Sequence, residues 1–162
     1  MKLRNARVED AAPLREIYNY YIEKTTISFE TEPLSVPDWE QRILEVTADG
    51  CPCIVCEDEG RVVGYAYAHR WKARASYKHT AETSVYVAHN LTGRGYGSCL
   101  MQELIKQCRA VGLHALIACI TSPNEPSFRL HERLGFRRAS EFKEVGRKFN
   151  RWLDVVDYQL CL

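Results

Sequence analysis

One stretch, residues 80–104, constrains the fold more than any other part of the chain. Residues 83–88 alternate in polarity and are rich in β-branched and aromatic side chains, which predicts a strand. Gly93, Gly95 and Gly97 follow this strand. Beyond them, apolar residues recur at helical spacing: Leu100, Met101, Leu104, Ile105, Cys108 and Val111. The sequence therefore predicts a strand, a glycine-spaced turn and an amphipathic helix in direct succession.

A strand, a glycine turn and a helix in this order are suited to binding phosphate groups. The first backbone N–H groups of a helix have no partner within the helix, and the helix dipole adds positive potential at the same end. Glycines let a bulky anion approach the main chain, and Arg94 adds a positive charge inside the turn. We therefore predict a phosphate or pyrophosphate cradle here, with a plain tight turn before a surface helix as the alternative.

Two well-known nucleotide motifs do not fit this turn. A Walker loop ends in Gly-Lys-Ser/Thr, whereas Gly97-Ser98-Cys99 lacks the lysine. A dinucleotide fingerprint needs G-x-G-x-x-G in a first βαβ unit and an acidic residue at the end of the next strand. Here the glycines are spaced differently, and the next predicted strand, residues 114–120, ends in Thr121-Ser122-Pro123. Both classes of nucleotide site are therefore excluded.

Length and composition narrow the class of protein. A chain of 162 residues with 46% apolar and 27% charged residues is typical of a single globular domain, here residues 1–162. A net charge of +1 gives no electrostatic reason to expect a nucleic-acid or membrane partner. No segment is apolar for long enough to span a bilayer, and the charged N-terminal residues do not resemble an export signal. We therefore expect a cytoplasmic protein.

The seven cysteines are an odd number without a regular framework, which favours reduced thiols. Cys51, Cys53 and Cys56 have a spacing that a metal site also uses. Apolar residues lie between them, and no second cluster of ligands stands nearby, so the same segment is equally typical of a buried strand. We predict the strand and no metal.

Elsewhere the pattern predicts short helices and strands joined by loops. The predicted helices begin at Glu9–Asp10 and end before Thr25, and then cover residues 38–47, the segment up to Ala110, and 126–133. Residues 25–37 are expected to form a loop. The predicted strands are 2–7, 53–57, 62–69, 77–88, 114–120, 137–148 and 152–160. The order β-α-α-β-β-β-α-β-α-β-β predicts an α/β fold with a mixed sheet.

Two motifs carry a resemblance to a known family. Residues 92–97, T-G-R-G-Y-G, resemble the acetyl-CoA loop Gln/Arg-x-x-G-x-G/A of the GNAT N-acetyltransferase superfamily, with Thr92 departing at the first position. Residues 124–136 resemble a second motif of the family, N-x-x-A/S-x-x-L-Y-x-x-x-G-F, with His131 in place of the tyrosine. This resemblance implies a mostly antiparallel sheet flanked by helices and splayed at its central strands, acetyl-CoA as cosubstrate, and a homodimer.

Further segments are similar to the phosphinothricin and methionine sulfoximine N-acetyltransferases: residues 29–33, 71–74, 82–87 and 146–155. The resemblance implies that Glu82 and His131 are catalytic. It implies cofactor contacts from Val85, Tyr86, Val87, Gly93, Arg94, Gly95, Tyr96, Gly97, Ser98 and Asn124. It also implies contacts with a small amine substrate from Phe29, Lys72, Ala73, Arg74, Glu82, Thr83 and Ser84, and Tyr77 is expected as an apolar wall.

The chemistry of acetyl transfer is consistent with these assignments. An amine that titrates about two units above ambient pH costs about 2.7 kcal/mol to deprotonate, and a carboxylate beside it can accept that proton. Glu82, at the start of the central strand, is the expected base, with a solvated strand-end acid as the alternative. His131 is expected to donate a proton to the departing thiolate, with a packed helix histidine as the alternative. Lys72 and Arg74 either hold an anionic group of the substrate or form a solvated basic loop.

Three functions are compatible with the sequence. The first is an N-acetyltransferase for small amino acids or analogues such as phosphinothricin, methionine sulfoximine or methionine sulfone. The second is an enzyme of the same family that acetylates protein N-termini or lysines. The third is a CoA-binding module without turnover, which the presence of both Glu82 and His131 disfavours.

Overall fold

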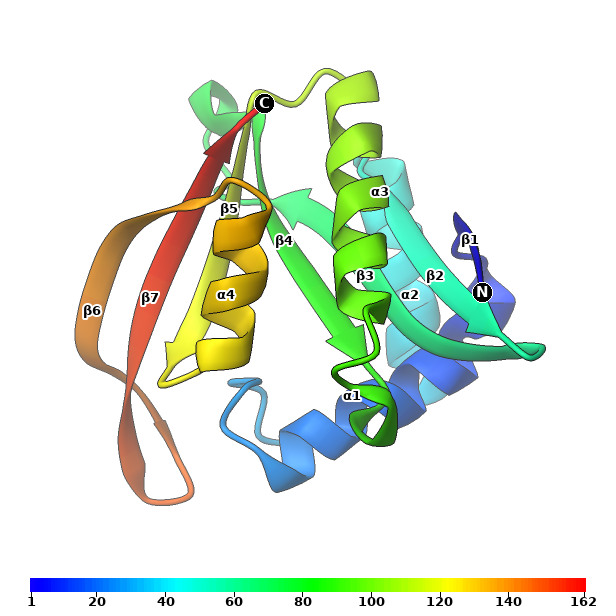
Figure 1. Ribbon diagram of the computed structural model, residues 1–162, viewed down its shortest axis with the longest axis horizontal. Helices are drawn as coiled ribbons and strands as arrows, with labels where there is room; N and C mark the ends of the chain where they lie inside the picture. The colour runs from blue at the N-terminus through cyan, green and yellow to red at the C-terminus, as the bar shows by residue number, and fades with distance from the viewer.

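The computed structural model describes residues 1–162 and is built on one sheet of seven strands (Figure 1). The strands are β1 (Lys2–Asn5), β2 (Cys53–Asp58), β3 (Arg61–Arg70), β4 (Thr80–Val87), β5 (Ala115–Ser122), β6 (Arg137–Lys148) and β7 (Arg151–Cys161). Their order across the sheet is β1-β2-β3-β4-β5-β7-β6. Every neighbouring pair is antiparallel except β4 and β5, which run parallel. The mixed, mostly antiparallel sheet is therefore confirmed.

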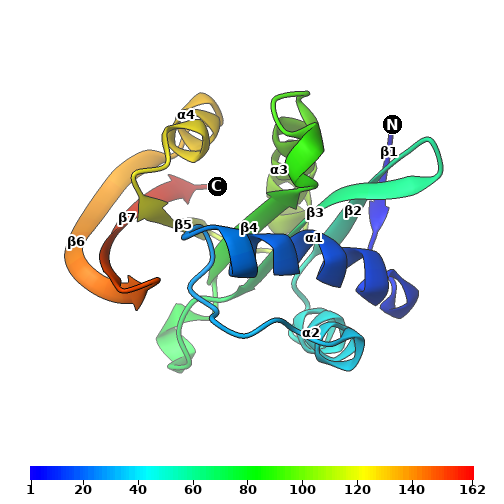
Figure 2. The ribbon, with the colours of Figure 1, turned by 90° about the horizontal axis from the view of Figure 1, so that it is seen from below.

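Four helices flank the sheet: α1 (Ala11–Lys24), α2 (Val36–Ala48), α3 (Tyr96–Ala110) and α4 (Glu125–Arg133). Figure 2 shows α1 and α2 on one face and α3 and α4 on the other. Because side chains of a strand alternate between faces, β4 serves both layers. Val85 and Val87 pack in the core beneath α3, whereas Tyr86 packs against the core beneath α1 and α2.

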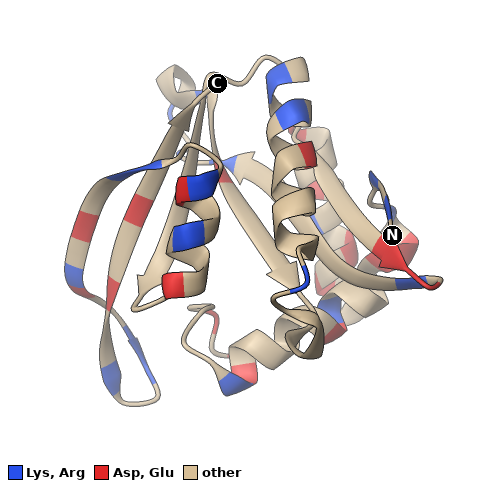
Figure 3. Cartoon of the chain, viewed as in Figure 1, with Lys and Arg blue, Asp and Glu red and all other residues tan.

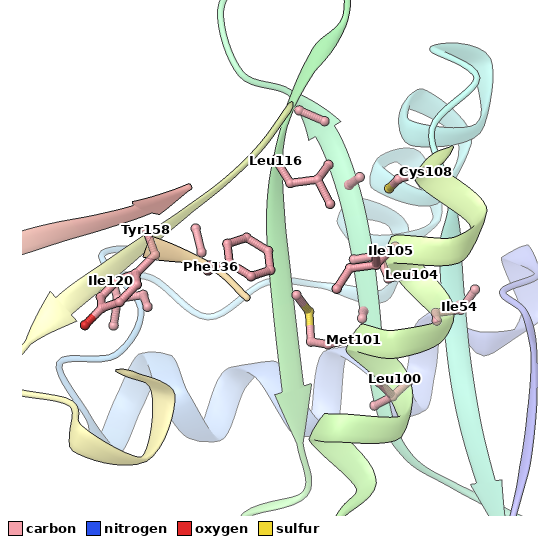
Figure 4. Packing of buried hydrophobic residues seen from close by; sticks show 14 of the residues in the cluster. Ile54, Leu100, Met101, Leu104, Ile105, Cys108, Leu116, Ile120, Phe136 and Tyr158 are labelled. Atoms are coloured by element: carbon pink, nitrogen blue, oxygen red, sulfur yellow. The ribbon is translucent and has the colours of Figure 1, made fainter. Parts of the chain in front are cut away.

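The larger core lies between the sheet and α3 (Figure 4). The apolar stripe predicted from the sequence, Leu100, Met101, Leu104, Ile105 and Cys108, is buried there. It packs against strand residues that include Ile54 and Leu116. This burial fixes α3, and with it the glycine turn, on the sheet. The amphipathic helix is confirmed, and it begins directly after that turn at Tyr96.

The sheet opens between its two central strands. β4 and β5 pair only from Thr80–Glu82 against Ala115–Ile117 and then separate, as Figure 1 shows. Beyond Glu82, the edge of β4 that faces β5 has no strand partner, although its other edge is paired with β3 as far as Val87. The Thr83 hydroxyl spans the start of the gap by donating to the Ile117 carbonyl at 3.3 Å. The predicted splay is confirmed.

Most predicted elements are present, and several predicted boundaries were wrong: β1 ends at Asn5 rather than Arg7, and β5 continues to Ser122 rather than Ile120. The strand predicted from Tyr77 begins at Thr80, because residues 75–77 form a 3-10 turn. The second helix begins at Val36 inside the predicted loop, because Ser35 caps it: the Asp38 amide donates to the Ser35 hydroxyl, and the Ser35 amide donates to the Asp38 carboxylate. The cysteine segment is strand β2, with Cys53 and Cys56 buried. No helix combines the length and the apolar character that crossing a bilayer requires.

Candidate active site

Three adjoining cavities surround the point where β4 and β5 separate. The glycine-loop cavity, about 460 Å³, lies beside residues 91–98. The sheet-face cavity, about 660 Å³, lies on the α1 and α2 side of the sheet. The junction cavity, about 60 Å³, lies between the separated strands. Ile27 and Tyr86 line all three, so the cavities meet at these two residues.

The glycine-loop cavity has the backbone geometry of an anion cradle. Gly95 precedes α3 with a φ of 88°, and Gly93 has a φ of 77°, both in the left-handed region that favours glycine. A Cβ atom at either position would meet nothing within 4 Å, so the main chain there is open to a ligand. The first N–H groups of α3 face this space with the positive end of the helix dipole. The residues present therefore fit a pyrophosphate group.

The charged side chains around this cavity differ from those predicted. Gly93, Gly95, Tyr96, Gly97 and Ser98 line it, but Arg94 does not. Positive charge comes instead from α4, where Arg129 and Arg133 line the opposite wall, and Figure 3 shows basic residues along this helix. The sequence analysis missed both arginines. Their spacing of four residues on one helix face was the only available signal.

The unpaired edge of β4 continues from the glycine-loop cavity toward the junction. Val85, Tyr86 and Val87 all line the glycine-loop cavity. The Val87 carbonyl accepts a hydrogen bond from the Tyr21 hydroxyl at 2.6 Å, which holds this end of β4 against α1. The Tyr86 ring packs between tyrosines of the inner layer, and burial raises its pKa well above the usual value. The side chains of residues 85–87 therefore pack on the two cores, and contact between their main chain and a cofactor stays a prediction.

Asn124 and His131 come from the α4 segment and both line the junction cavity. Asn124 caps α4, where its side-chain oxygen accepts from the Ser127 amide at 3.3 Å. His131 is 3% exposed, and its Nδ1 donates to the Ser127 carbonyl at 2.8 Å. Because a carbonyl only accepts, the neutral ring carries its hydrogen on Nδ1 and leaves Nε2 as an acceptor. Burial lowers the pKa of His131, and the Ser127 hydrogen bond opposes that shift.

Glu82 is the last residue of β4 that pairs with β5, and it lines the sheet-face cavity. Burial raises its pKa, a nearby Asp157 adds to the rise, and a hydrogen bond from the Cys119 thiol opposes it. A raised pKa brings a carboxylate closer to the range in which it accepts a proton from an amine. Ser84 follows on the same face and lines both the sheet-face and the junction cavities. The carboxylate predicted as the base therefore stands beside the gap in the sheet.

Only some of the residues predicted to contact the amine substrate line one of the three cavities. Phe29 lines the sheet-face cavity, but Lys72, Ala73 and Arg74 line none of the three cavities. They lie on an exposed loop after β3, where the Lys72 ammonium sits 4.0 Å from the centre of the Trp71 ring. Tyr77 packs on the same tryptophan rather than on the cavity. Thr83 is buried on the opposite face of β4 and reaches the junction cavity instead.

A different arginine occupies the wall of the sheet-face cavity. Arg42 of α2 lines it and donates to the Glu30 carboxylate at 2.7 Å. Its guanidinium also packs over the Trp39 ring, 5.0 Å from its centre. Sequence patterns gave no signal for Arg42, because an arginine on an amphipathic helix is ordinarily solvated. The fold turns it toward the cavity by packing Trp39 beneath it.

Comparison with known proteins identifies the family of this fold and site. Residues 3–156 match the family model described as the acetyltransferase (GNAT) domain. The chain belongs to the GNAT acetyltransferase family. It is therefore an acyltransferase, and its fold is that of the family.

Curated relatives of this chain have names that describe acetylation of amino-acid analogues. Phosphinothricin N-acetyltransferase of Streptomyces viridochromogenes is 41% identical over 98% of this chain and 86% of its own length. The L-methionine sulfoximine/L-methionine sulfone acetyltransferase of Pseudomonas paraeruginosa is 37% identical over 99% of this chain and 94% of its own length.

Solved structures of GNAT proteins match the whole fold. The yncA acetyltransferase of Salmonella typhimurium, solved with its cofactor acetyl-CoA, has a TM-score of 0.98 and 35% identity over 100% of this chain and 94% of its own. A protein named ribosomal-protein-alanine N-acetyltransferase, from Brucella melitensis, also has a TM-score of 0.98, with 37% identity over 100% of both chains.

Proposed function

We propose that this GNAT enzyme transfers the acetyl group of acetyl-CoA directly to the amine of a small amino acid or analogue of the phosphinothricin, methionine sulfoximine or methionine sulfone type. One observation carries the proposal. A cavity suited to a diphosphate and a cavity holding Glu82 lie on either side of the gap between β4 and β5 and share Ile27 and Tyr86. The names of the curated relatives support the substrate class.

The donor occupies the glycine-loop cavity in this proposal. Backbone N–H groups beside Gly93, Gly95, Gly97 and Ser98 hold the pyrophosphate, and Arg129 and Arg133 add charge from the other wall. The unpaired main chain of Val85–Val87 holds the pantetheine arm in the manner of an added strand. The acetyl thioester then lies at the junction cavity, beside Asn124 and His131.

Residues on both sides of the junction share the proton chemistry. Acetyl-CoA supplies an activated acyl group with a thiolate as leaving group. Glu82 takes the proton of the substrate ammonium, directly or through a water, so that the free amine attacks the thioester carbon. A main-chain N–H of the open β4 edge stabilises the negative charge on the thioester oxygen. The attacking nitrogen then still carries one proton too many, and His131, whose neutral ring presents an acceptor at Nε2, takes that proton and passes it to the sulfur as the carbon–sulfur bond breaks.

The substrate occupies the sheet-face cavity, with Phe29 and Ser84 in its wall. We propose that Lys72, Ala73 and Arg74 contact the anionic group of the substrate, since their loop continues directly from Arg70, which lines that cavity. Arg42 is the competing candidate for the same role, because it already lies in the wall. No metal takes part in this proposal.

Acetylation of a protein N-terminus is the second candidate function, and the name of the Brucella melitensis structure favours it. The two candidate substrates differ in whether part of the bound molecule must extend out of the sheet-face cavity. A small amino acid fits inside its 660 Å³, whereas a peptide needs a path past the 25–35 loop, which forms part of the wall. Acceptance of an N-terminal peptide in preference to any free amino acid would support the second candidate.

We also propose that the enzyme is a cytoplasmic homodimer. All seven cysteines are free, which suits a reducing compartment. Four exposed apolar side chains lie on the β6–β7 hairpin, Phe142, Val145, Phe149 and Trp152, and a second copy of the chain would cover them. Light scattering during gel filtration tests the dimer, which requires twice the mass of the 18.7 kDa chain.

The test of the proposed function is a panel of amines assayed with acetyl-CoA by the release of free thiol. The panel holds phosphinothricin, methionine sulfoximine, methionine sulfone, the plain amino acids and an N-terminal alanine peptide. We expect the sulfone, sulfoximine or phosphinothricin to give the highest kcat/KM. CoA binding without thiol release for any member of the panel would contradict the proposal and favour a non-catalytic CoA-binding module.

A further inference from the structure

The loop between α1 and α2 stands where the three cavities meet. Ile27 lines all three, and Ser28, Phe29 and Glu30 line the sheet-face cavity alone. In Figure 1 this loop lies beneath α4 and beside the end of β5, on the opposite side of the picture from the N-terminal strand. Its position therefore decides the shape of the wall beside Glu82.

Several polar contacts attach the loop to the N-terminal half of the chain. At its two ends, the Thr25 hydroxyl donates to the Tyr21 carbonyl, and the Asn19 side chain exchanges two hydrogen bonds with the main chain of Leu34. The Ser28 hydroxyl donates to the Tyr18 hydroxyl of α1 at 2.9 Å. The Glu30 carboxylate forms an ion pair with Arg42 of α2 at 2.7 Å. These contacts tether the loop to the helices from which it projects, and they do not fix it against the other side of the gap.

Contacts from the C-terminal strands hold the opposite side of the loop. Lys148, the last residue of β6, donates from Nζ to the Ser28 carbonyl at 2.6 Å. The Phe29 ring lies against Gly146, where a Cβ atom would stand 2.3 Å from the ring. The Thr121 hydroxyl of β5 donates to the Ile27 carbonyl at a longer distance, 3.5 Å. The loop thus bridges two parts of the molecule that lie on either side of the β4–β5 gap.

Lys148 is an unusual residue for such a contact. It is 5% exposed, and its ammonium makes one hydrogen bond, to a main-chain carbonyl, with no carboxylate within ion-pair distance. Its charge also lies 5.2 Å from the centre of the Phe149 ring. Burying an ammonium is unfavourable unless its donors are satisfied, so an apolar side chain would serve packing better. Its distinctive property is the directed bond to Ser28.

We propose that Lys148 is a positioning residue for the acceptor substrate: it fixes the 25–35 loop from the far side of the sheet gap, so that Ile27 and Phe29 close the cavity around the reacting amine. The inference rests on the proposed function for its kinetic consequence. The structural part of the inference, that β6 holds the loop in place, is independent of that function.

The central test is Lys148→Met, which keeps the length of the side chain and removes the donor. Two readouts are needed: steady-state kinetics with both substrates varied, and hydrogen–deuterium exchange of the amides of residues 25–35. We expect about tenfold faster exchange in the loop and about a tenfold rise in the KM for the acceptor. The KM for acetyl-CoA should change less than twofold, because three of the four wall residues of the loop line only the sheet-face cavity.

The matched control is Lys143→Met on the same strand, whose exposed ammonium pairs with Asp154 at the surface. It should leave loop exchange and both KM values unchanged. If Lys148→Met prevents folding, Gly146→Ala displaces the same loop from the other contact by driving a Cβ atom into the Phe29 ring. It should produce the same selective rise in the acceptor KM.

Equal rises in both KM values, or a loop whose amides exchange as slowly as in the unaltered enzyme, would overturn the proposal. If the unaltered enzyme acetylates no amine of the panel, the proposed function fails. The exchange measurement then still decides whether Lys148 holds the loop, so the two failures are distinguishable.

Discussion

The glycine-loop cavity and the sheet-face cavity lie side by side but are built in different ways. The first has main chain along one wall, at the amides before α3 and the open edge of β4, and faces α4 with Arg129 and Arg133 on the other. The second is lined by residues from seven separate parts of the chain, including Phe29, Arg42, Glu82 and Cys119. A main-chain site depends on backbone geometry and tolerates many side chains, whereas a side-chain site changes with each substitution. This difference suits a family that keeps one donor and varies the acceptor.

We therefore expect a substitution in one cavity to leave ligand binding in the other cavity unchanged. A change that removes a side chain of the sheet-face cavity should spare the binding of CoA. A change that strains the backbone of the glycine loop should spare the recognition of the acceptor.

Glu82→Gln should lower kcat by roughly 10²- to 10⁴-fold, because the amide cannot accept the proton of the substrate ammonium. Since Glu82 lines the sheet-face cavity and not the glycine-loop cavity, the Kd of CoA should stay within twofold of its original value. Steady-state kinetics and calorimetric titration with CoA measure the two effects. Glu16→Gln, an exposed position on α1, is the matched control. A kcat within threefold of the original would remove Glu82 from the chemistry.

Gly95→Val should produce the opposite pattern. A β-branched residue at a φ of 88° is strained by about 1–3 kcal/mol, and its side chain enters space that is open in the cradle. That strain corresponds to a loss of CoA affinity of roughly 5- to 150-fold. The KM for the acceptor should change little at saturating acetyl-CoA. Unchanged CoA affinity in calorimetry would show that the diphosphate binds elsewhere.

Lys72→Ala and Arg74→Ala test whether these two cations contact the acceptor in the sheet-face cavity. If these exposed residues hold the anionic group of the substrate, each should raise the acceptor KM by up to about fivefold, in line with about 0.2–1 kcal/mol for an exposed ion pair, and leave kcat nearly unchanged. Kinetics with methionine sulfone measure the split. An unchanged KM for both variants would exclude them and leave Arg42 as the cation of the cavity.

Cys119→Ala should have the smallest effect, visible only in the pH profile. The thiol lowers the pKa of Glu82 through its hydrogen bond, while burial raises it. Without the thiol the pKa of Glu82 rises further, so the acidic limb of kcat/KM moves to higher pH, because the base works only when deprotonated. Cys161→Ala, exposed on β7, should leave the limb in place. A shift to lower pH would contradict the described environment of Glu82.

The main-chain parts of the site could be predicted from the sequence more fully than the side-chain parts. The glycine turn, the helix after it and the order of the elements follow from local rules of propensity and periodicity, and all were confirmed. Glu82 and Phe29 were also placed in the cavity that the structure shows. Local rules suffice wherever the site is made of main chain.

The rest depends on contacts between residues far apart in the chain. Lys148 and Ser28 are separated by 120 positions, and no local pattern links them. Arg129 replaces Arg94 in the cradle because α4 packs across from the glycine turn, which only the fold reveals. Lys72 and Arg74 were predicted from a motif, and the structure places them outside the cavities. Side chains that reach the site only through tertiary packing, such as Arg42 and Lys148, thus escape prediction from the sequence.

A crystal structure of the enzyme with CoA and methionine sulfone bound together tests the central claim most directly. The account predicts that the pyrophosphate contacts the amides of residues 93–98 and that the sulfur lies in the junction cavity. It also predicts that the amine of the acceptor lies within hydrogen-bonding reach of Glu82, directly or through one water. A diphosphate bound away from the glycine turn, or an amine on the far side of the sheet from Glu82, would contradict it.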